Sequence, residues 1–300
     1  MTDRPKGPGE SWMLGLPIFA CAAWKGSVYP PKAARTEWLT HYAKRYRAVE
    51  GNSTFYALPS PDVIRSWIDK TYPGFGFSFK FPQAITHQRQ LEDADAETKA
   101  FLETLWPLHE AKRLAPTMVQ LPPFFGPDRL PTLLNYLDDL PRELEVAVEP
   151  RHAAYFEGGP SEERLDQELA DRGVERVLMD SRCLFSAPPR SDAERDARRK
   201  KPNLPVKVAP LTDRPMVRLI CRDSLKETEP WLAEWAGHLA HWIERGKHPI
   251  LFLHAPNDAA EPGHTARLLE LLAEKGIGPP ALPVEDDAAS GPSRQQGSLF

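Results

Sequence analysis

The sequence contains few cysteines, no long apolar run and no excess of positive charge. Its 300 residues include only three cysteines, Cys21, Cys183 and Cys221, which are far apart and odd in number. That spacing fits neither a disulfide framework nor a zinc site, so we expect core thiols in a reduced, cytoplasmic protein. No segment reaches the ~18 consecutive apolar residues of a membrane span, so we expect no membrane association.

The charge balance limits the range of partners. The formal net charge is −4 at pH 7, which excludes a global attraction to nucleic acid and restricts any such contact to a local patch. Glycine is scarce beside proline, at 18 residues against 32, which predicts many fixed turns and helix starts. A hydrophobic content of 41% with a charged content of 27% is typical of a soluble globular chain.

The first apolar stretch, residues 13–23, resembles a secretion signal because basic residues precede it and small residues end it. Glu10 beside the stretch and Pro17 within it argue against export. We therefore interpret residues 16–21 as the first strand of the fold.

Short apolar runs that end in polar or charged residues alternate with segments of helical spacing. The predicted strands are 16–21, 46–50, 75–80, 117–121, 145–149, 175–180, 216–220 and 249–254. The predicted helices are 36–45, a helix from Ser60, 94–111, 128–140, 161–171, 231–244 and 265–275. Eight such units in about 265 residues predict an α/β fold of the (β/α)8 TIM-barrel type, whose usual size is ~250 residues. The alternative is an open doubly wound sheet, but the glycine-rich phosphate turn expected after its first strand is missing.

Two segments fall outside the regular repeat. Residues 181–215 are longer than a normal connection and contain a cluster of basic residues. Residues 277–300 are rich in Pro, Ala, Ser and Asp, which is typical of a flexible tail. We therefore predict an arm over 1–12, a single TIM barrel over 13–276 and a disordered C-terminal tail over 277–300.

Six stretches resemble the YecE-like family, a bacterial domain of unknown function. They are VEGNSTFYALPSP (49–61), FSFKFPQAITHQ (77–88), VQLPPFFGP (119–127), VEPRH (148–152), LMDSR (178–182) and RRKKPNLPV (198–206). The resemblance covers nearly the whole predicted barrel, in matching order, and it implies a TIM-barrel fold in agreement with the strand count. It assigns no catalytic residue, because no activity is settled for the family.

The sequence departs from the family pattern at three strand ends. Where the family often has Arg-x-His-Gly at strand seven, this chain has Arg218-Leu219-Ile220-Cys221. The usual Ser-Gly-Trp after strand one is replaced by Ala22-Ala23-Trp24, and the paired Asn residues after strand eight by His-Ala-Pro-Asn-Asp at 254–258. We do not expect chemistry that depends on the missing His or Asn.

The carboxyl ends of the strands of a TIM barrel meet at one mouth, so the polar residues that end the runs should lie together. We predict Glu50, Glu149 and Asp180 as catalytic residues. The predicted substrate-binding residues are Asn52, Lys80, His87, Gln120, Arg151, His152, Arg218 and Asn257. Burial and opposite charges would shift the pKa values of the carboxylates and make an acid/base pair available for a sugar or nucleotide, while arginines suit a phosphate. The alternative is that these charges neutralise each other as buried ion pairs that plug the barrel.

We predict no cofactor. A divalent metal is the alternative, since His87, His152 and the three carboxylates include suitable ligands. Lys80 and Arg218 would repel a metal, however, and the sequence has no paired histidines of the H-x-x-x-H type. It also has no G-x-S-x-G motif for a nucleophilic serine.

Two features predict macromolecular partners. The last residues, Gln296-Gly297-Ser298-Leu299-Phe300, are similar to the Q-L-S-L-F peptide with which bacterial proteins bind the replicative sliding clamp. Leu299 and Phe300 would fill an apolar pocket and Gln296 would supply hydrogen bonds, while Gly297 in place of Leu should weaken the contact. The alternatives are a chance similarity, docking of the tail on the barrel, or another partner.

The basic cluster in the long connection predicts a possible contact with nucleic acid through Arg198, Arg199, Lys200 and Lys201. The alternative is a solvated helix, because acidic residues lie beside the cluster.

These observations favour an enzyme, a hydrolase or a lyase, that acts on a phosphorylated or nucleic-acid-derived substrate at the barrel mouth and is recruited to DNA by its tail. One alternative is a non-catalytic adaptor that binds nucleic acid or a protein. Another is a metabolic sugar or nucleotide enzyme whose tail has no role.

Overall fold

Nine strands form the centre of the computed structural model, which describes residues 12–280 and residue 282. The strands are β1 (Met13–Leu16), β2 (Ala48–Gly51), β3 (Gly76–Phe79), β4 (Thr117–Gln120), β5 (Val146–Glu149), β6 (Glu175–Arg176), β7 (Leu178–Asp180), β8 (Met216–Ile220) and β9 (Ile250–His254). They lie in a six-stranded parallel sheet, β3-β2-β1-β9-β8-β7, and a three-stranded parallel sheet, β4-β5-β6.

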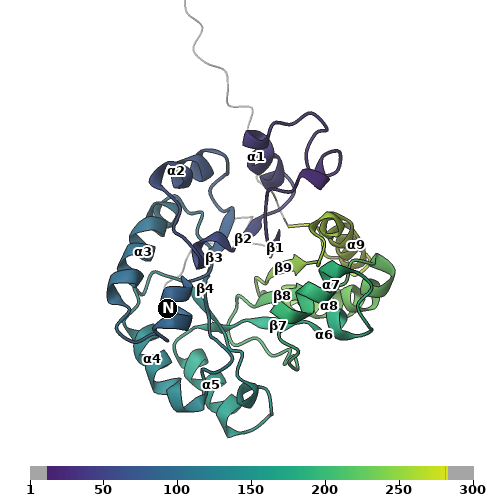
Figure 1. The fold of residues 1–300 in the computed structure, drawn as a ribbon. Helices are drawn as coiled ribbons and strands as arrows, with labels where there is room; N and C mark the ends of the chain where they lie inside the picture. Colours follow the sequence, from purple (N-terminus) through teal and green to yellow (C-terminus); the bar gives the residue numbers. More distant parts are fainter. Residues whose placement is uncertain (1–11, 281, 283–300) are drawn as a thin grey trace, which may run out of the picture.

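The two sheets join into one barrel of eight strands. Only Val177 separates β6 from β7, so the two are halves of one strand: β6 pairs with β5, and β7 pairs with β8. On the other side, isolated parallel bridges link Phe77 with Leu114 and Lys80 with Met118, which brings β3 beside β4. The strands therefore form a ring with helices around it (Figure 1), and the predicted TIM barrel is confirmed.

The outer ring consists of helices that follow the strands in order. They are α1 (Trp38–Ala43), α2 (Pro61–Asp69), α3 (Asp95–Glu110), α4 (Leu130–Asp138), α5 (Pro160–Asp171), α8 (Leu225–Glu244) and α9 (Glu261–Ala273). Several begin with proline in the first turn, where the missing N–H is not needed and the fixed φ suits the helix. None of the helices within residues 12–280 combines the length and the hydrophobicity of a membrane span.

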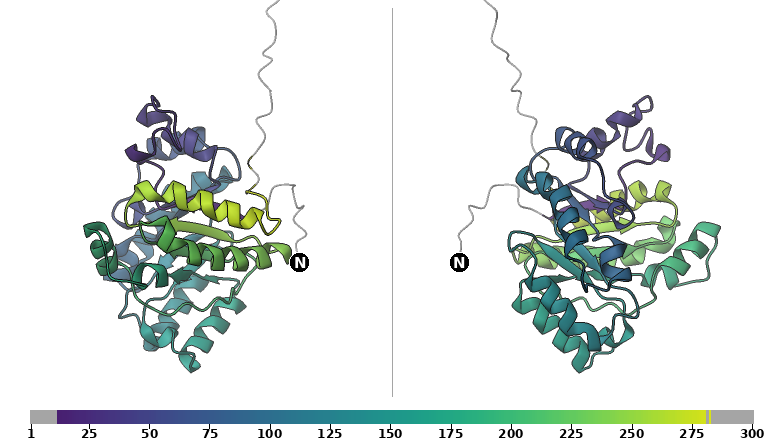
Figure 2. Two further views of the ribbon diagram at one scale, coloured as in Figure 1. Left: turned by 90° about the vertical axis from the view of Figure 1, so that its right-hand side faces the viewer. Right: turned by 60° about the vertical axis from the view of Figure 1, so that its left-hand side comes forward.

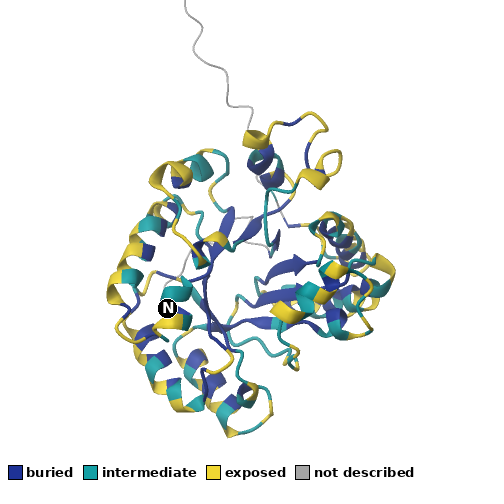
Figure 3. Ribbon diagram, in the orientation of Figure 1, coloured by how far each residue is buried: buried dark blue, intermediate teal, exposed yellow. Residues whose placement is uncertain are grey.

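Two separate apolar layers stabilise the barrel. A large outer layer packs the strands against the helices that surround them (Figure 2). The opposite faces of these helices are exposed (Figure 3). A small inner layer fills the barrel and consists of Ala48, Met118, Ala147, Val177, Met216, Ile250 and Phe252, with Met13 against it. Because strand side chains alternate between faces, the inner layer fixes which residues of each strand point into the barrel.

The first strand lies three residues earlier than predicted: β1 covers Met13–Leu16, and the prediction of 16–21 was wrong. Two features of the ladder explain the difference. Gly15 passes so close to β2 that a Cβ there would lie 2.3 Å from the Ala48 carbonyl oxygen, so only glycine fits this crossing. Pro17 has no N–H to donate and follows directly after the end of the ladder.

Other boundaries agree with the predictions within a few residues, apart from the start of α8. The helix begins at Leu225, whereas the sequence predicted a start after Pro230. Proline marks a helix start only in the first turn, and here it is accommodated further inside.

The long connection between β7 and β8 is folded against the barrel. It contains α6 (Arg182–Phe185) and α7 (Asp192–Lys200). The buried carboxylate of Glu194 in α7 binds Arg222, which follows β8, at 2.8 Å. Closer to the barrel end, the Ser181 hydroxyl donates to the Pro202 carbonyl at 2.6 Å. These contacts hold the residues between them, including Lys201, against the carboxyl ends of the strands.

Candidate functional site

A polar layer lies directly above the inner apolar layer, two residues further along each strand. The pairs of inner residue and polar residue are Ala48 and Glu50, Met118 and Gln120, Ala147 and Glu149, Met216 and Arg218, and Phe252 and His254. Since two residues is the period of a strand, both members of each pair point into the barrel. The polar layer therefore closes the mouth of the barrel with groups from five strands.

Arg218 is at the centre of this layer, and its side chain is fully buried. Its Nε and Nη2 donate to the two oxygens of Glu50 at 2.8 Å each, and its Nη1 donates to Glu149 Oε2 at 2.5 Å. A bidentate pair of this kind fixes both groups in one geometry. The guanidinium thus links β8 to β2 and β5 across the barrel.

Glu149 also holds a second arginine. Arg151 Nε donates to Glu149 Oε1 at 2.8 Å, and its Nη2 donates to Gln120 Oε1 at 3.0 Å. Burial alone would raise the pKa of Glu149, but Arg218, Arg151 and Lys80 outweigh it and lower that pKa to about 2. Glu149 is therefore ionised near neutral pH.

Glu50 is surrounded by donors in the same way. Lys80 Nζ lies 3.4 Å from Glu50 Oε1, and His254 Nε2 lies 3.0 Å from Glu50 Oε2. Burial opposes ionisation, but Arg218, with His254 and Lys80, holds the pKa of Glu50 well below its usual range. Burial lowers the pKa of His254 to about 3 despite Glu50, so the imidazole is neutral and its Nε2–H donates to the carboxylate.

The groups of the mouth that titrate near neutral pH are two lysines. Burial, with repulsion by Arg218, lowers the pKa of Lys80 to about 8. Burial, with repulsion by Arg218 and Lys80, lowers the pKa of Lys201 to about 7. Lys201 comes from the long connection, so the structure places it beside the polar layer and not on the basic surface predicted for it.

The charges of the mouth do not cancel. Glu50 and Glu149 supply two negative charges, whereas Arg151, Arg218, Lys80 and Lys201 supply four positive charges when both lysines are protonated. The difference of four and two is a net charge of +2. Ion pairs are present, as the plug alternative predicted, and the excess of cations gives the mouth a positive electrostatic potential.

The ion pairs restrict the two glutamates to one half of the predicted acid/base role. Both are ionised, and both are held by Arg218, so neither carries a proton to donate near neutral pH, whereas a carboxylate can still accept one. Their hydrogen bonds also orient the two arginines.

Asp180 does not face the polar layer. Its carboxylate accepts hydrogen bonds from Arg182 Nη2 at 2.7 Å and from Trp235 Nε1 at 2.8 Å, on the helix side of β7. The inner positions of this strand are Val177 and Met179, and Arg218 Nη1 lies 3.9 Å from the Met179 sulfur. Asp180 therefore has the opposite parity to Glu50 and Glu149 along their strands, and this explains why the structure does not bring Asp180 to the other two candidates.

Three predicted binding residues shape the loops above the mouth. Asn52 Nδ2 donates to the Pro17 carbonyl at 3.1 Å and ties the exit of β2 to that of β1. His152 Nδ1 and Asn257 Oδ1 each accept from the backbone N–H two residues further on, at 3.2 and 3.1 Å, and so cap short 3-10 turns. These contacts use one polar atom of each side chain.

His87 lies closer to the charged groups. Its ring packs edge-on against Phe55 at 5.1 Å, and its Nδ1 lies 2.9 Å from the Thr86 hydroxyl. Burial, with repulsion by Arg151, lowers the pKa of His87. The side chain is therefore uncharged near neutral pH and half-buried at the rim.

The predicted nucleic-acid-binding residues have different surroundings. Arg198 donates to two backbone carbonyl groups of the turn at 184–187, so it holds α7 in place. Arg199 and Lys200 are exposed on the surface, where Asp196 lies 3.8 Å and 2.6 Å from them. Lys201 alone of the four lies in the mouth.

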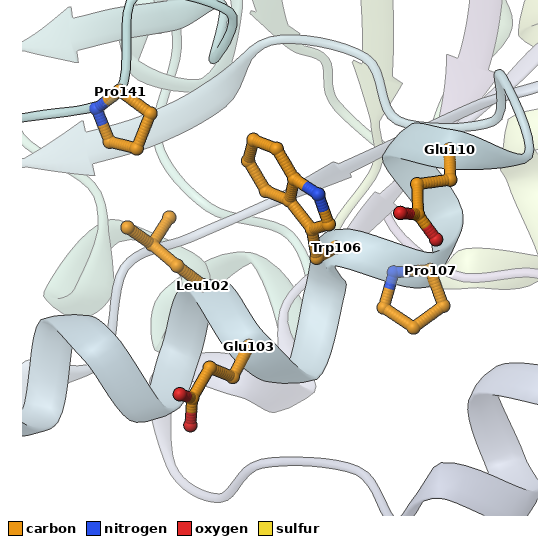
Figure 4. Close-up of a pocket in the computed structure, with 6 residues that line it drawn as sticks. All are labelled: Leu102, Glu103, Trp106, Pro107, Glu110 and Pro141. Carbon is orange, nitrogen blue, oxygen red and sulfur yellow. The ribbon is translucent and has the colours of Figure 1, made fainter.

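A hollow of about 520 Å³ lies away from these charges, against α3 (Figure 4). Its lining is Leu102, Glu103, Trp106, Pro107, Glu110 and Pro141. Trp106 is near the end of α3 and Pro141 precedes β5, so the hollow lies at the amino ends of the strands. We place the candidate site at the mouth, because TIM barrels carry chemistry at the carboxyl ends and the buried charges are there.

In the described part of the chain, no three His, Cys, Asp or Glu side chains gather in a cluster that could hold a metal ion. The carboxylates of the mouth are instead engaged by cations. Cys183 and Cys221 are buried, and Cys21 is half-buried. Gln296, Leu299 and Phe300 lie outside the described residues.

Comparison with known proteins places the chain in a family. Residues 13–287 match the family described as "Protein of unknown function DUF72". The chain belongs to this family. It is also similar to the UPF0759 protein YecE of Escherichia coli K12, with 40% identity over 266 residues that cover 87% of this chain and 92% of the relative. The same protein of Escherichia coli O157:H7 matches equally well.

Two crystal structures of DUF72 proteins resemble the fold. One, from Thermotoga maritima, is 23% identical, has a TM-score of 0.64 and covers 88% of this chain and 99% of its own. The other, from Enterococcus faecalis, is 16% identical, has a TM-score of 0.66 and covers 91% of this chain and 98% of its own. These likenesses support the barrel, whereas the function must be argued from the site.

Proposed function

We propose that this DUF72 protein is an enzyme that binds a phosphorylated or nucleic-acid-derived substrate at the carboxyl end of the barrel. The observation that carries the proposal is the excess of cations around Arg218. Two lysines from distant segments, Lys80 and Lys201, approach the same pair of ionised glutamates as two arginines. Such a site attracts a multiply charged anion such as a phosphate.

The residues of the mouth form two groups: a rigid set of ion pairs, here called the floor, and two lysines that titrate near neutral pH. Arg218 and the two glutamates form the floor, because their hydrogen bonds are mutual and buried. Arg151 and Lys201 lie where they can contact the anion. Lys80 and Lys201, whose pKa values are near neutrality, can accept or donate a proton in a hydrolase or lyase reaction.

Replacing Lys201 with alanine should weaken the binding of pyrophosphate by about tenfold or more, because one charge-assisted contact is lost. The matched control is Lys200→Ala, which removes the adjacent lysine from the exposed surface beside Asp196. The measurement is isothermal titration calorimetry of the full-length protein and both variants. Equal affinities of the two variants would contradict the proposal, and so would a wild-type protein that binds no phosphate compound.

Recruitment to the bacterial sliding clamp is the second part of the proposal. Its support is the similarity of Gln296, Leu299 and Phe300 to the clamp-binding peptide. The full-length protein should bind a purified clamp with a Kd of about 1 μM or weaker, and Leu299→Ala/Phe300→Ala should abolish that binding. Surface plasmon resonance measures both, and an intact protein that shows no binding at about 100 μM would exclude recruitment by this tail.

A non-catalytic adaptor is the competing function. The exposed Arg199 and Lys200 favour it, since they could contact a phosphate backbone outside the mouth. The pyrophosphate measurement separates the two, because the adaptor loses binding in Lys200→Ala and the enzyme loses it in Lys201→Ala.

A further inference from the structure

Two aromatic side chains stand exposed at the rim of the mouth. Tyr56 is 75% exposed and Phe124 is 61% exposed. They belong to the loops that follow β2 and β4, so both lie at the carboxyl ends of the strands, where the polar layer is. Exposed aromatic rings beside cations are suited to stack on a ligand that has a flat face and a negative charge.

The residues around both rings limit the conformational freedom of the two aromatic side chains. Tyr56 packs edge-on against Phe55 at 5.2 Å, and Phe55 packs edge-on against His87. Phe124 follows two consecutive prolines and precedes the fully buried Phe125, which restricts the backbone on both sides. Little conformational entropy is therefore lost when a planar group stacks on them.

A cation lies near one of the two rings. Lys200 is close enough to Tyr56 for the phenol to contribute to the raised pKa of the lysine, after the larger effect of Asp196. The following residue, Lys201, lies beside Arg218 in the mouth. The long connection thus brings positive charge from the polar layer up to the aromatic rim.

We infer that the mouth binds a nucleoside phosphate, with the phosphate on Arg151 and Lys201 and the base stacked on the rim formed by Tyr56 and Phe124. This inference rests on the proposed function and narrows its substrate class. Stacking on aromatic rings combined with cations for the phosphate is the usual way in which proteins hold a nucleotide of a single strand. The nucleotide comes either from solution or from the end of a single strand, and the two sources share this chemistry.

The test compares three probes on the full-length protein by calorimetry: deoxyribose 5-phosphate, dAMP, and a 5′-phosphorylated single-stranded DNA decamer. We expect dAMP to bind about tenfold tighter than deoxyribose 5-phosphate, because only dAMP has a base to stack.

Tyr56→Ala/Phe124→Ala should remove this difference and leave the affinity for deoxyribose 5-phosphate unchanged. Tyr56→Phe/Phe124→Tyr should keep it, since both side chains remain aromatic. Trp106→Ala is the control, because it removes an aromatic ring from the opposite end of the barrel.

The outcomes distinguish the inference from the function on which it rests. Equal binding of dAMP and deoxyribose 5-phosphate by the wild-type protein would overturn the stacking inference and leave the phosphate site standing. Binding of none of the three probes would overturn both. If the rim variant loses affinity for the bases, tighter binding of the decamer than of dAMP identifies a strand end as the ligand, and equal binding identifies a free nucleotide.

Discussion

Arg218→Met should lower the free energy of unfolding by about 3–5 kcal/mol, because it leaves two buried carboxylates without their main partner. Glu50 and Glu149 are almost completely inaccessible to solvent, so water cannot replace the guanidinium. Methionine fills most of the volume of arginine, and the loss therefore reports the charges more than a cavity. Urea denaturation followed by circular dichroism measures the effect.

Two further variants decide whether the uncompensated charges cause this loss. Arg199→Met removes an arginine that is exposed and 3.8 Å from Asp196, and it should change stability by less than ~0.5 kcal/mol. Arg218→Lys keeps one positive charge between the two glutamates and should therefore lose less stability than Arg218→Met. An Arg218→Lys variant as unstable as Arg218→Met would show that the charge at this position does not cause the loss.

Acid should destabilise the protein already between pH 6.5 and pH 4.5, before most carboxylates titrate. The pKa of His254 is about 3 in the folded protein, whereas its ordinary value is 6.5. Below pH 6.5 this histidine is therefore protonated in the unfolded chain and remains neutral in the folded protein. Stability therefore falls as pH falls, by about 2–3 kcal/mol per such histidine over this range. His264, whose pKa burial lowers to about 4, adds to the same slope. Glu261 opposes it, because burial raises its pKa to about 9 and the folded protein keeps a proton there that the unfolded chain releases above pH 4.5.

Below pH 4.5 the loss should continue through Glu149. Its pKa is about 2 in the folded protein against 4.5 ordinarily, so its contribution is complete above pH 4.5 and is lost as pH falls towards 2. His254→Asn should remove most of the net slope between pH 6.5 and 4.5, because the contributions of His264 and Glu261 nearly offset each other, and it should leave the slope at lower pH in place. Thermal unfolding over the pH series measures this, with His238→Asn, a half-buried histidine outside the mouth, as control. An unchanged slope in His254→Asn would show that this histidine is charged in the folded protein.

The barrel and much of its mouth could be predicted from the sequence, because both follow from the period of the strands. Glu50, Lys80, Gln120, Glu149 and Arg218 end or follow apolar runs, and the structure brings them together. The same period, applied strictly, would have excluded Asp180, which follows an inner Met179 by one residue. It would also have found His254, two residues after the inner Phe252.

Other features could not be predicted, since they depend on contacts between distant segments. Nothing local in the basic cluster distinguishes Lys201 from Lys200; the end of α7 and the hydrogen bond between Ser181 and Pro202 decide which of them enters the mouth. The position of the first strand depends on the close crossing of Gly15 and Ala48. Arg218 can bind both Glu50 and Glu149 only if the barrel has the right diameter, and no single segment of the sequence determines that diameter.

The contact of Arg218 with Glu149 joins the six-stranded sheet to the three-stranded sheet. The larger sheet alone supplies Glu50 as a partner for Arg218 Nε and Nη2. The partner of Arg218 Nη1 is Glu149, which belongs to β5 in the smaller sheet. The group of charges around Arg218 is therefore complete only in a closed ring. If the mouth binds an anion as proposed, the ligand would bind the closed barrel and not an open one, and it would stabilise the closed barrel against unfolding and proteolysis.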